Sequence, residues 1–135
     1  MKLSDNTISV LKNYSTINQN LMINMGSTLS TMSAMKNIVA KATVEETFEQ
    51  DVAIYDLNEF LGCMSLFTNL DLDFQDKFVV MKGETNNSLK YWYSDPSVVT
   101  TVTKEITMPE CEVKFTLSTE QLSEINRAAA SIGAP

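Results

Sequence analysis

Residues 51–62, Asp51-Val52-Ala53-Ile54-Tyr55-Asp56-Leu57-Asn58-Glu59-Phe60-Leu61-Gly62, predict a buried strand that passes directly into a helix. The run 52–55 is short, apolar and uncharged, which is typical of a strand covered on both faces. Asp56 is followed three residues later by Glu59, the spacing of a capping box. A wide apolar stripe then runs along the helix, formed by Leu57, Phe60, Leu61, Met64 and Phe67.

The residues on either side repeat one order of elements. An opening helix, capped by Ser4 or Asp5, places Ile8, Leu11 and Tyr14 on one face, which we expect to lie on a sheet. Patterns of strand type follow at 21–25, 28–35, 38–44, 70–74, 78–81 and 89–93. Gly26-Ser27 predicts a hairpin turn between the first two. One helix and three strands therefore occur twice, with the strand at 52–55 between them, and this order predicts an α+β fold.

Composition excludes several classes of protein. The net charge of −7, from 17 acidic and 10 basic residues, argues against a strongly basic DNA-binding domain, because affinity for phosphates grows with the number that Lys and Arg neutralise. Arg127 is the single arginine, so we expect no reading of base edges. The absence of His removes Ser-His and Cys-His nucleophiles and most zinc sites. Cys63 and Cys111 are far apart in the sequence, and we expect two reduced, buried thiols in a reducing cytoplasm.

No apolar run approaches the roughly 20 residues that span a bilayer, so we expect no membrane segment. We also expect no metal and no cofactor. Asp71, Asp73 and Asp76 have part of the spacing of a calcium loop, but the third oxygen ligand, the glycine and the bidentate glutamate are lacking. Tyr91-Trp92-Tyr93 alternates between two faces, which favours a core strand over a base-stacking platform.

The second part of the chain predicts a linker and the beginning of another domain. We place the first domain at 1–95, an extended linker at 96–109 and a strand with a helix at 110–135. Cys111, Val113, Phe115 and Leu117 alternate with polar residues, and Ser118 with Gln121 predicts a capped helix after them. Leu117-Ser118 and the apolar spacing beyond it repeat Leu3-Ser4 at an offset of 114 residues, although two amphipathic helices can match by chance.

Two stretches resemble a known family. The residues are Met1-Lys2-Leu3-Ser4, with Leu11-Lys12-Asn13 and Thr16-Ile17-Asn18, and above all the run 51–62. They are similar to the DNA polymerase sliding clamp, or processivity factor, of T-even-type bacteriophages. The resemblance implies the DNA-clamp fold, in which helices lie on one face of a curved antiparallel sheet. It also implies three subunits of two similar domains each, closed into a ring whose helices line a hole for DNA.

The same resemblance implies a function without catalysis. Such a clamp encircles duplex DNA regardless of sequence and tethers the replicative polymerase, in the cytoplasm of the infected bacterial host. A clamp loader opens the ring, and a role in late transcription is also implied. Compared with the family, the chain is expected to hold a complete first domain, the linker and only the first strand and helix of the second domain.

Three bases are the candidates for facing DNA: Lys2, Lys12 and Arg127. A few bases on helices that line the hole would offset phosphate repulsion without stalling the sliding motion. Each is equally explained as a solvated charge on the outer face of a helix, and the helix after Asp56 has no base at all. If the clamp interpretation holds, the three bases are expected to project from one concave surface.

Two other interpretations remain open. An uncovered strand and helix at 106–135 predict self-association through strand edges, with Val113, Phe115, Leu122 and Ile125 as the contact residues. A phage structural or assembly module would use only that property. An enzyme would instead use carboxylates such as Asp51 and Asp56, and predicts a deep pocket where acids converge.

Overall fold

The computed structural model describes residues 1–134, which fold into two units. The first unit comprises Met1–Lys104, and the second begins at Glu105. The elements of the first unit are α1 (Asp5–Ile17), β1 (Leu21–Ile23), β2 (Gly26–Met32), β3 (Val39–Phe48), β4 (Val52–Ile54), α2 (Leu57–Ser65), β5 (Asp71–Phe74), β6 (Phe78–Lys82), β7 (Ser88–Trp92) and the 3-10 helix η1 (Pro96–Val98). The second unit contains α3 (Thr119–Ser131).

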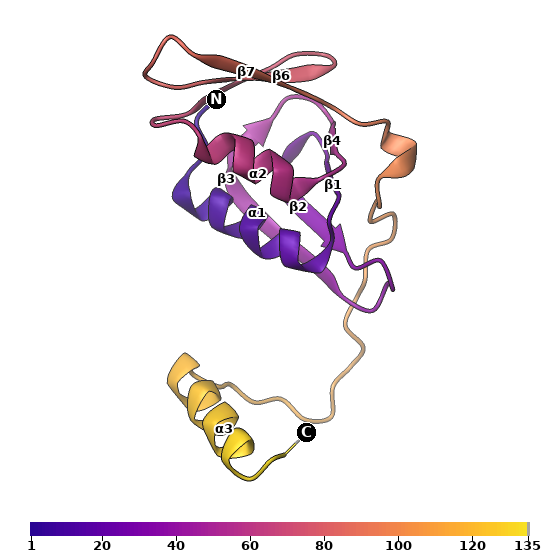
Figure 1. Cartoon of the computed structure of the whole chain (residues 1–135). Coiled ribbons are helices and arrows are strands. Elements are labelled where there is room, and N and C mark those ends of the chain that lie inside the picture. The colour runs from indigo at the N-terminus through magenta and orange to yellow at the C-terminus, as the bar shows by residue number, and fades with distance from the viewer. Residues whose placement is uncertain (135) are drawn as a thin grey trace. The chain divides into compact units, whose positions relative to one another are not determined.

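The strands of the first unit form three antiparallel sheets, in the orders β1-β4, β2-β3 and β5-β6-β7. Helices α1 and α2 pack against each other and lie on the same side of the strands (Figure 1). One hydrophobic core joins both helices to all three sheets, with Leu11, Leu29, Ile54, Phe60 and Met81 among its buried members. The expected α+β fold, with helices on one face of antiparallel sheets, is therefore confirmed.

The stretch 51–62 forms the expected strand and helix. All three residues of β4 are buried, and Asp56 is the N-cap of α2, accepting a hydrogen bond of 2.9 Å from the Glu59 N–H. Phe60 is 1% exposed, and its ring meets the Tyr91 ring edge-on at 5.1 Å between centroids. The turn from β4 into α2 thus connects a buried strand directly to a helix of the same hydrophobic core.

The first correction concerns Gly26. The predicted hairpin at Gly26-Ser27 is wrong, because β1 pairs with β4 and β2 pairs with β3. Gly26 has φ +117°, a conformation that favours glycine, and the preceding Met25 N–H donates to the Asp51 carboxylate at 2.7 Å. The glycine therefore redirects the chain from one sheet into another.

Strand β3 is longer than the sequence pattern indicated, because it runs through the acidic residues to Phe48. Val44 and Phe48 are buried, and Glu46 between them is only partly exposed. The Glu46 carboxylate accepts hydrogen bonds from the Ser4 N–H and the Thr7 hydroxyl, at the N-terminus of α1. Ser4 itself is the N-cap of α1, as expected. Glu46 of β3 therefore connects the start of α1 to the sheet by hydrogen bonds.

The two edge strands of the three-stranded sheet, β5 and β7, have different neighbours. Met1 covers the edge of β5: its carbonyl accepts from the Leu72 N–H at 2.8 Å and its ammonium group donates to the Leu72 carbonyl at 2.6 Å. On β7 at the opposite edge, Trp92 is 62% exposed while Tyr91 packs against the core, which confirms the expected alternation. Within residues 1–134, β7 pairs with one strand, β6.

The expected linker begins as part of the first unit. Val99 is 7% exposed and packs with Met22 and Ala53, and the Thr100 N–H donates to the Asn20 side chain at 2.8 Å. These contacts explain why the first unit reaches Lys104, beyond the predicted domain end at residue 95. The sequence gives no sign that Val99 is buried, because the run 97–107 consists largely of similar β-branched and polar residues.

In the second unit the helix is confirmed and the strand is not. Ser118 caps α3 in a complete capping box with Gln121. Residues 111–117 belong to no sheet in the part of the chain that the structure describes. A strand is held by hydrogen bonds to a neighbour, and alternation alone does not supply that neighbour. Likewise, Cys63 and Cys111 are free thiols as expected, but both are partly exposed instead of buried.

Limited digestion with trypsin tests this division. Lys104 is exposed and ends the first unit, in a stretch outside helices and strands. The expected first cut follows Lys104 and releases a stable fragment 1–104, identified by its mass. A stable fragment that ended at Lys90 or Lys82 would show that Val99 does not anchor the chain.

Candidate functional site

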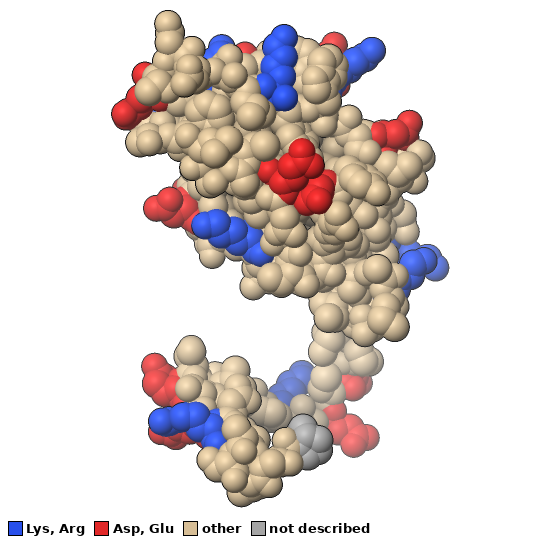
Figure 2. Space-filling view, in the orientation of Figure 1, with Lys and Arg blue, Asp and Glu red and all other residues tan. Residues whose placement is uncertain are grey.

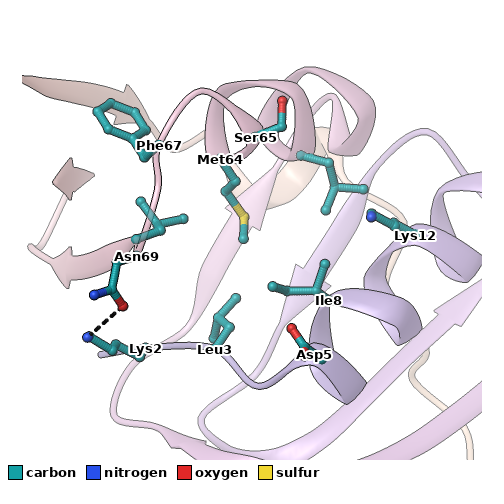
Figure 3. A pocket seen from close by; sticks show the side chains of 11 residues that line it. Lys2, Leu3, Asp5, Ile8, Lys12, Met64, Ser65, Phe67 and Asn69 are labelled. Carbon is teal, nitrogen blue, oxygen red and sulfur yellow. Dashed lines mark hydrogen bonds between the residues drawn. The ribbon is translucent and has the colours of Figure 1, made fainter. Parts of the chain in front are cut away.

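A groove of about 460 Å³ lies between α1 and α2. Its floor is apolar and its rim is polar (Figure 3). The lining residues are Lys2, Leu3, Asp5, Ile8, Lys12, Leu61, Met64, Ser65, Phe67, Asn69 and Leu70. The groove therefore lies where α1 and α2 pack side by side over the same core.

The structure brings two of the three candidate bases together. Lys2 precedes α1 and Lys12 lies on it, and both are exposed and line the groove. The Lys2 ammonium group donates to the Asn69 side-chain oxygen at 3.0 Å (Figure 3). Asn69 has φ +57°, and its amide nitrogen donates to Glu84 at 3.0 Å. The loop after α2 thus positions Lys2 on the rim.

The face formed by α1 and α2 is only weakly charged. Figure 2 shows few basic side chains over the two helices, with acidic ones beside them. Most exposed positions of the helices are neutral and polar: Asn6, Ser9, Asn13, Thr16, Asn58 and Ser65. Hydroxyl and amide groups can donate to phosphate oxygens without the strong attraction of a dense basic patch. This surface suits weak contact with a polyanion.

Arg127 belongs to the second unit. It lies on α3 and lines a shallow hollow together with Leu122 and Ala130. The four expected contact residues are exposed in that unit, at 75% for Val113, 77% for Phe115, 49% for Leu122 and 51% for Ile125. These apolar side chains lack cover within the described residues of the second unit.

The carboxylates expected of an enzyme have structural tasks. Asp51 accepts from the Met25 N–H, and Asp56 accepts from the Glu59 N–H and the Gln19 amide. The backbone hydrogen bond from Glu59, with the Gln19 bond second, lowers the pKa of Asp56, which disfavours proton transfer near neutral pH. Neither aspartate lines the groove between the helices.

Three further findings concern possible metal ligands, Asp71 and the lengths of the helices. Residues 1–134 contain no group of three or more His, Cys, Asp or Glu placed to hold a metal ion. Asp71 instead forms an ion pair of 2.8 Å with the Met1 ammonium group. Among the helices of the same residues, none is both long and apolar enough to cross a membrane.

Sequence reasoning missed two side chains, one that secures the start of α1 and one that lines the groove. Glu46 holds the start of α1, but its partners Ser4 and Thr7 are about 40 residues away in the chain, as the separations of 42 and 39 show. Asn69 positions Lys2 from 67 residues away. Neither contact has a local sequence signal, although an asparagine is the residue type that best tolerates a positive φ after glycine.

Comparison with known proteins gives consistent matches. A family model described as DNA polymerase processivity factor matches residues 3–99. Over 136 residues the chain is 36% identical to the protein named Sliding clamp from Vibrio phage KVP40, an alignment that covers 98% of this chain and 62% of the phage protein. It is 32% identical over 133 residues to the Sliding clamp of Enterobacteria phage T4 and 27% identical over 133 residues to that of Escherichia phage RB69, covering 98% of this chain and 58% of each relative. The chain thus spans between 58% and 62% of the length of these relatives.

Proposed function

This chain belongs to the DNA polymerase processivity factor family, and we propose that it forms part of a sliding clamp that holds a replicative polymerase on duplex DNA. In the proposed assembly, three subunits enclose the DNA, a clamp loader opens the ring, and the clamp itself carries out no catalysis. The setting is the cytoplasm of an infected bacterium. The observation that carries the proposal is the pair of adjacent helices, α1 and α2. Their exposed positions hold Lys12, and Lys2 just before α1, together with Asp5, Glu59 and mostly neutral polar side chains.

The face of α1 and α2 is proposed to lie against the DNA. Its two lysines provide attraction, and the neutral side chains let the duplex change position without breaking many strong bonds. Because each neutralised phosphate releases about 0.9 counterion, two lysines give a shallow dependence of affinity on salt. Arg127 on α3 is proposed as a third base that faces DNA. A weak, sequence-independent contact is what sliding requires.

A titration with a short duplex tests this site in the 135-residue chain. Amide chemical shifts are followed by NMR at low salt, and the expected changes cluster on α1, α2 and Lys2. The double variant Lys2→Ala, Lys12→Ala is expected to reduce the slope of log affinity against log salt by about 1.8, because two phosphate contacts are lost.

The matched control removes two lysines from the other side of the strands. Lys82 and Lys90 are exposed on β6 and β7, so Lys82→Ala, Lys90→Ala changes the net charge equally. We expect this variant to retain most of the affinity and the salt slope of the wild type. Equal losses in both double variants, or shift changes centred on β5, β6 and β7, would contradict the proposed face.

A further inference from the structure

Asn69 lies between a basic and an acidic side chain and is hydrogen-bonded to both. The Lys2 ammonium group donates to its side-chain oxygen at 3.0 Å (Figure 3), and its amide nitrogen donates to the Glu84 carboxylate at 3.0 Å. The three residues precede α1, follow α2 and follow β6, respectively. Two consecutive hydrogen bonds therefore join the connection between β6 and β7 to the rim of the groove.

Backbone contacts hold the two loops of this row together. The Glu84 N–H donates to the Thr68 carbonyl at 3.2 Å. At Gly83 an added Cβ would lie 3.1 Å from the Thr68 carbonyl oxygen, so the lack of a side chain permits this close approach. Asn69 has φ +57°, which asparagine tolerates better than most residues. Glu84 and Asn69 are thus neighbours through the backbone as well as through their exposed side chains.

The chemistry of the three groups fixes the direction of the row. A carboxylate only accepts hydrogen bonds and an ammonium group only donates them, whereas an amide does both through different atoms. Glu84 therefore takes the Asn69 nitrogen and leaves the Asn69 oxygen for Lys2. Without the carboxylate, the amide can turn its nitrogen toward the ammonium group, which then lacks an acceptor there. The ammonium group has three donors, so two remain for a phosphate.

We propose that Asn69 and Glu84 are positioning residues for contact between Lys2 and a phosphate of the DNA backbone, an inference that rests on the function proposed above. A lysine side chain loses conformational entropy when it is fixed on a phosphate, and one that is already held loses less. An acidic residue, Glu84, thereby strengthens the binding of a polyanion. Charge alone predicts the opposite, because an exposed carboxylate repels phosphates.

Two variants of Glu84 separate positioning from charge. Glu84→Gln and Glu84→Ala remove the same negative charge, but only glutamine retains an oxygen that can accept from Asn69. Dissociation constants for the short duplex are measured on the 135-residue chain by NMR titration at low salt. Glu84→Gln is expected to bind at least as tightly as the wild type, and Glu84→Ala about threefold more weakly than Glu84→Gln. Equal affinities for the two variants would overturn the proposal, because charge would then explain the whole effect.

Asn69→Gly removes the amide and keeps a residue that adopts a positive φ. Its affinity is expected to be about threefold lower than that of the wild type, while the slope of log affinity against log salt stays the same because Lys2 keeps its charge. Added to Lys2→Ala, the same substitution is expected to have no further effect. A further loss in that background would show that Asn69 acts on binding by a route other than Lys2, and the proposal would be wrong.

The side-chain amide signals of Asn69 test the two contacts without DNA. Lys2→Ala and Glu84→Ala are each expected to shift these signals, and Lys12→Ala is the control that leaves them in place. Signals that do not respond to Lys2→Ala would contradict the proposal. If Lys2→Ala, Lys12→Ala weakens DNA binding while Glu84→Ala and Glu84→Gln bind equally, only the positioning role fails. If the loss of both lysines leaves affinity unchanged, the proposed DNA face fails, and the positioning role fails with it.

Discussion

Replacing Phe60 by alanine is expected to lower the free energy of unfolding of the first unit by about 3–5 kcal/mol. Phe60 is 1% exposed and contacts Tyr91 edge-on, at 5.1 Å between ring centroids. It lies on α2 and belongs to the hydrophobic core that joins both helices to all three sheets, so its loss opens a cavity in that core. Urea unfolding followed by Trp92 fluorescence measures the change, because Trp92 lies in the same unit.

Leu66→Ala is the matched control for that substitution. Leu66 follows the last residue of α2 and is 73% exposed, so its truncation is expected to change the free energy of unfolding by no more than about 0.5 kcal/mol. A loss below about 1 kcal/mol for Phe60→Ala would be below the range for a buried phenylalanine and would contradict its place in the core.

Replacing Glu46 by alanine is expected to lower the free energy of unfolding by about 2–3 kcal/mol, although many residues of β3 are exposed. Its carboxylate accepts from the Ser4 N–H and from the hydroxyl of Thr7, which is fully buried. A negative charge at this place also favours the N-terminus of α1. The neighbouring Glu45 is exposed, so Glu45→Ala removes the same charge and is expected to change stability by no more than about 0.5 kcal/mol.

The contribution of Glu46 is expected to depend on pH. Burial raises the pKa of Glu46. The hydrogen bonds from Thr7 and Ser4 lower it by more than burial raises it, so the pKa in the folded chain lies below the ordinary value. Since the folded pKa is depressed, the stabilisation is complete above the unfolded pKa of about 4.3 and is lost as the pH falls through the folded pKa. The difference in stability between wild type and Glu46→Gln should therefore be constant from pH 7 to about 5 and shrink below about 4. A difference that did not vary with pH would contradict this assignment.

Local signals predicted most elements correctly because each signal acts over a few residues. The cap at Asp56, the apolar run of β4 and the capping box at Ser118 involve neighbours in the chain, and all three are present in the structure. Strand partners are different, because they depend on residues far away. Gly26 has a strong turn signal, yet the long-range pairing of β1 with β4 decides that the turn leads into another sheet.

The candidate site shows the same division. The lysines at positions 2 and 12 could be proposed from their place on or before the first helix. Their presence on one groove depends on α2 lying beside α1 and on Asn69 contacting Lys2, which involves a separation of 67 residues. The place of β7 at the end of the strand order β5-β6-β7, within residues 1–134, likewise could not be read from the strand pattern.

The sequence by itself determined the α+β class, the helix caps, the family resemblance and the absence of histidine-based chemistry. Each of these depends on residue type and short spacing, which folding does not alter. Only the tertiary structure decided which strands pair, that Glu46 secures α1, that Val99 anchors the chain after β7, and that Lys2 and Lys12 share a groove. The reason is physical: these contacts join residues tens of positions apart, and they form only when burial of a common core brings the elements together.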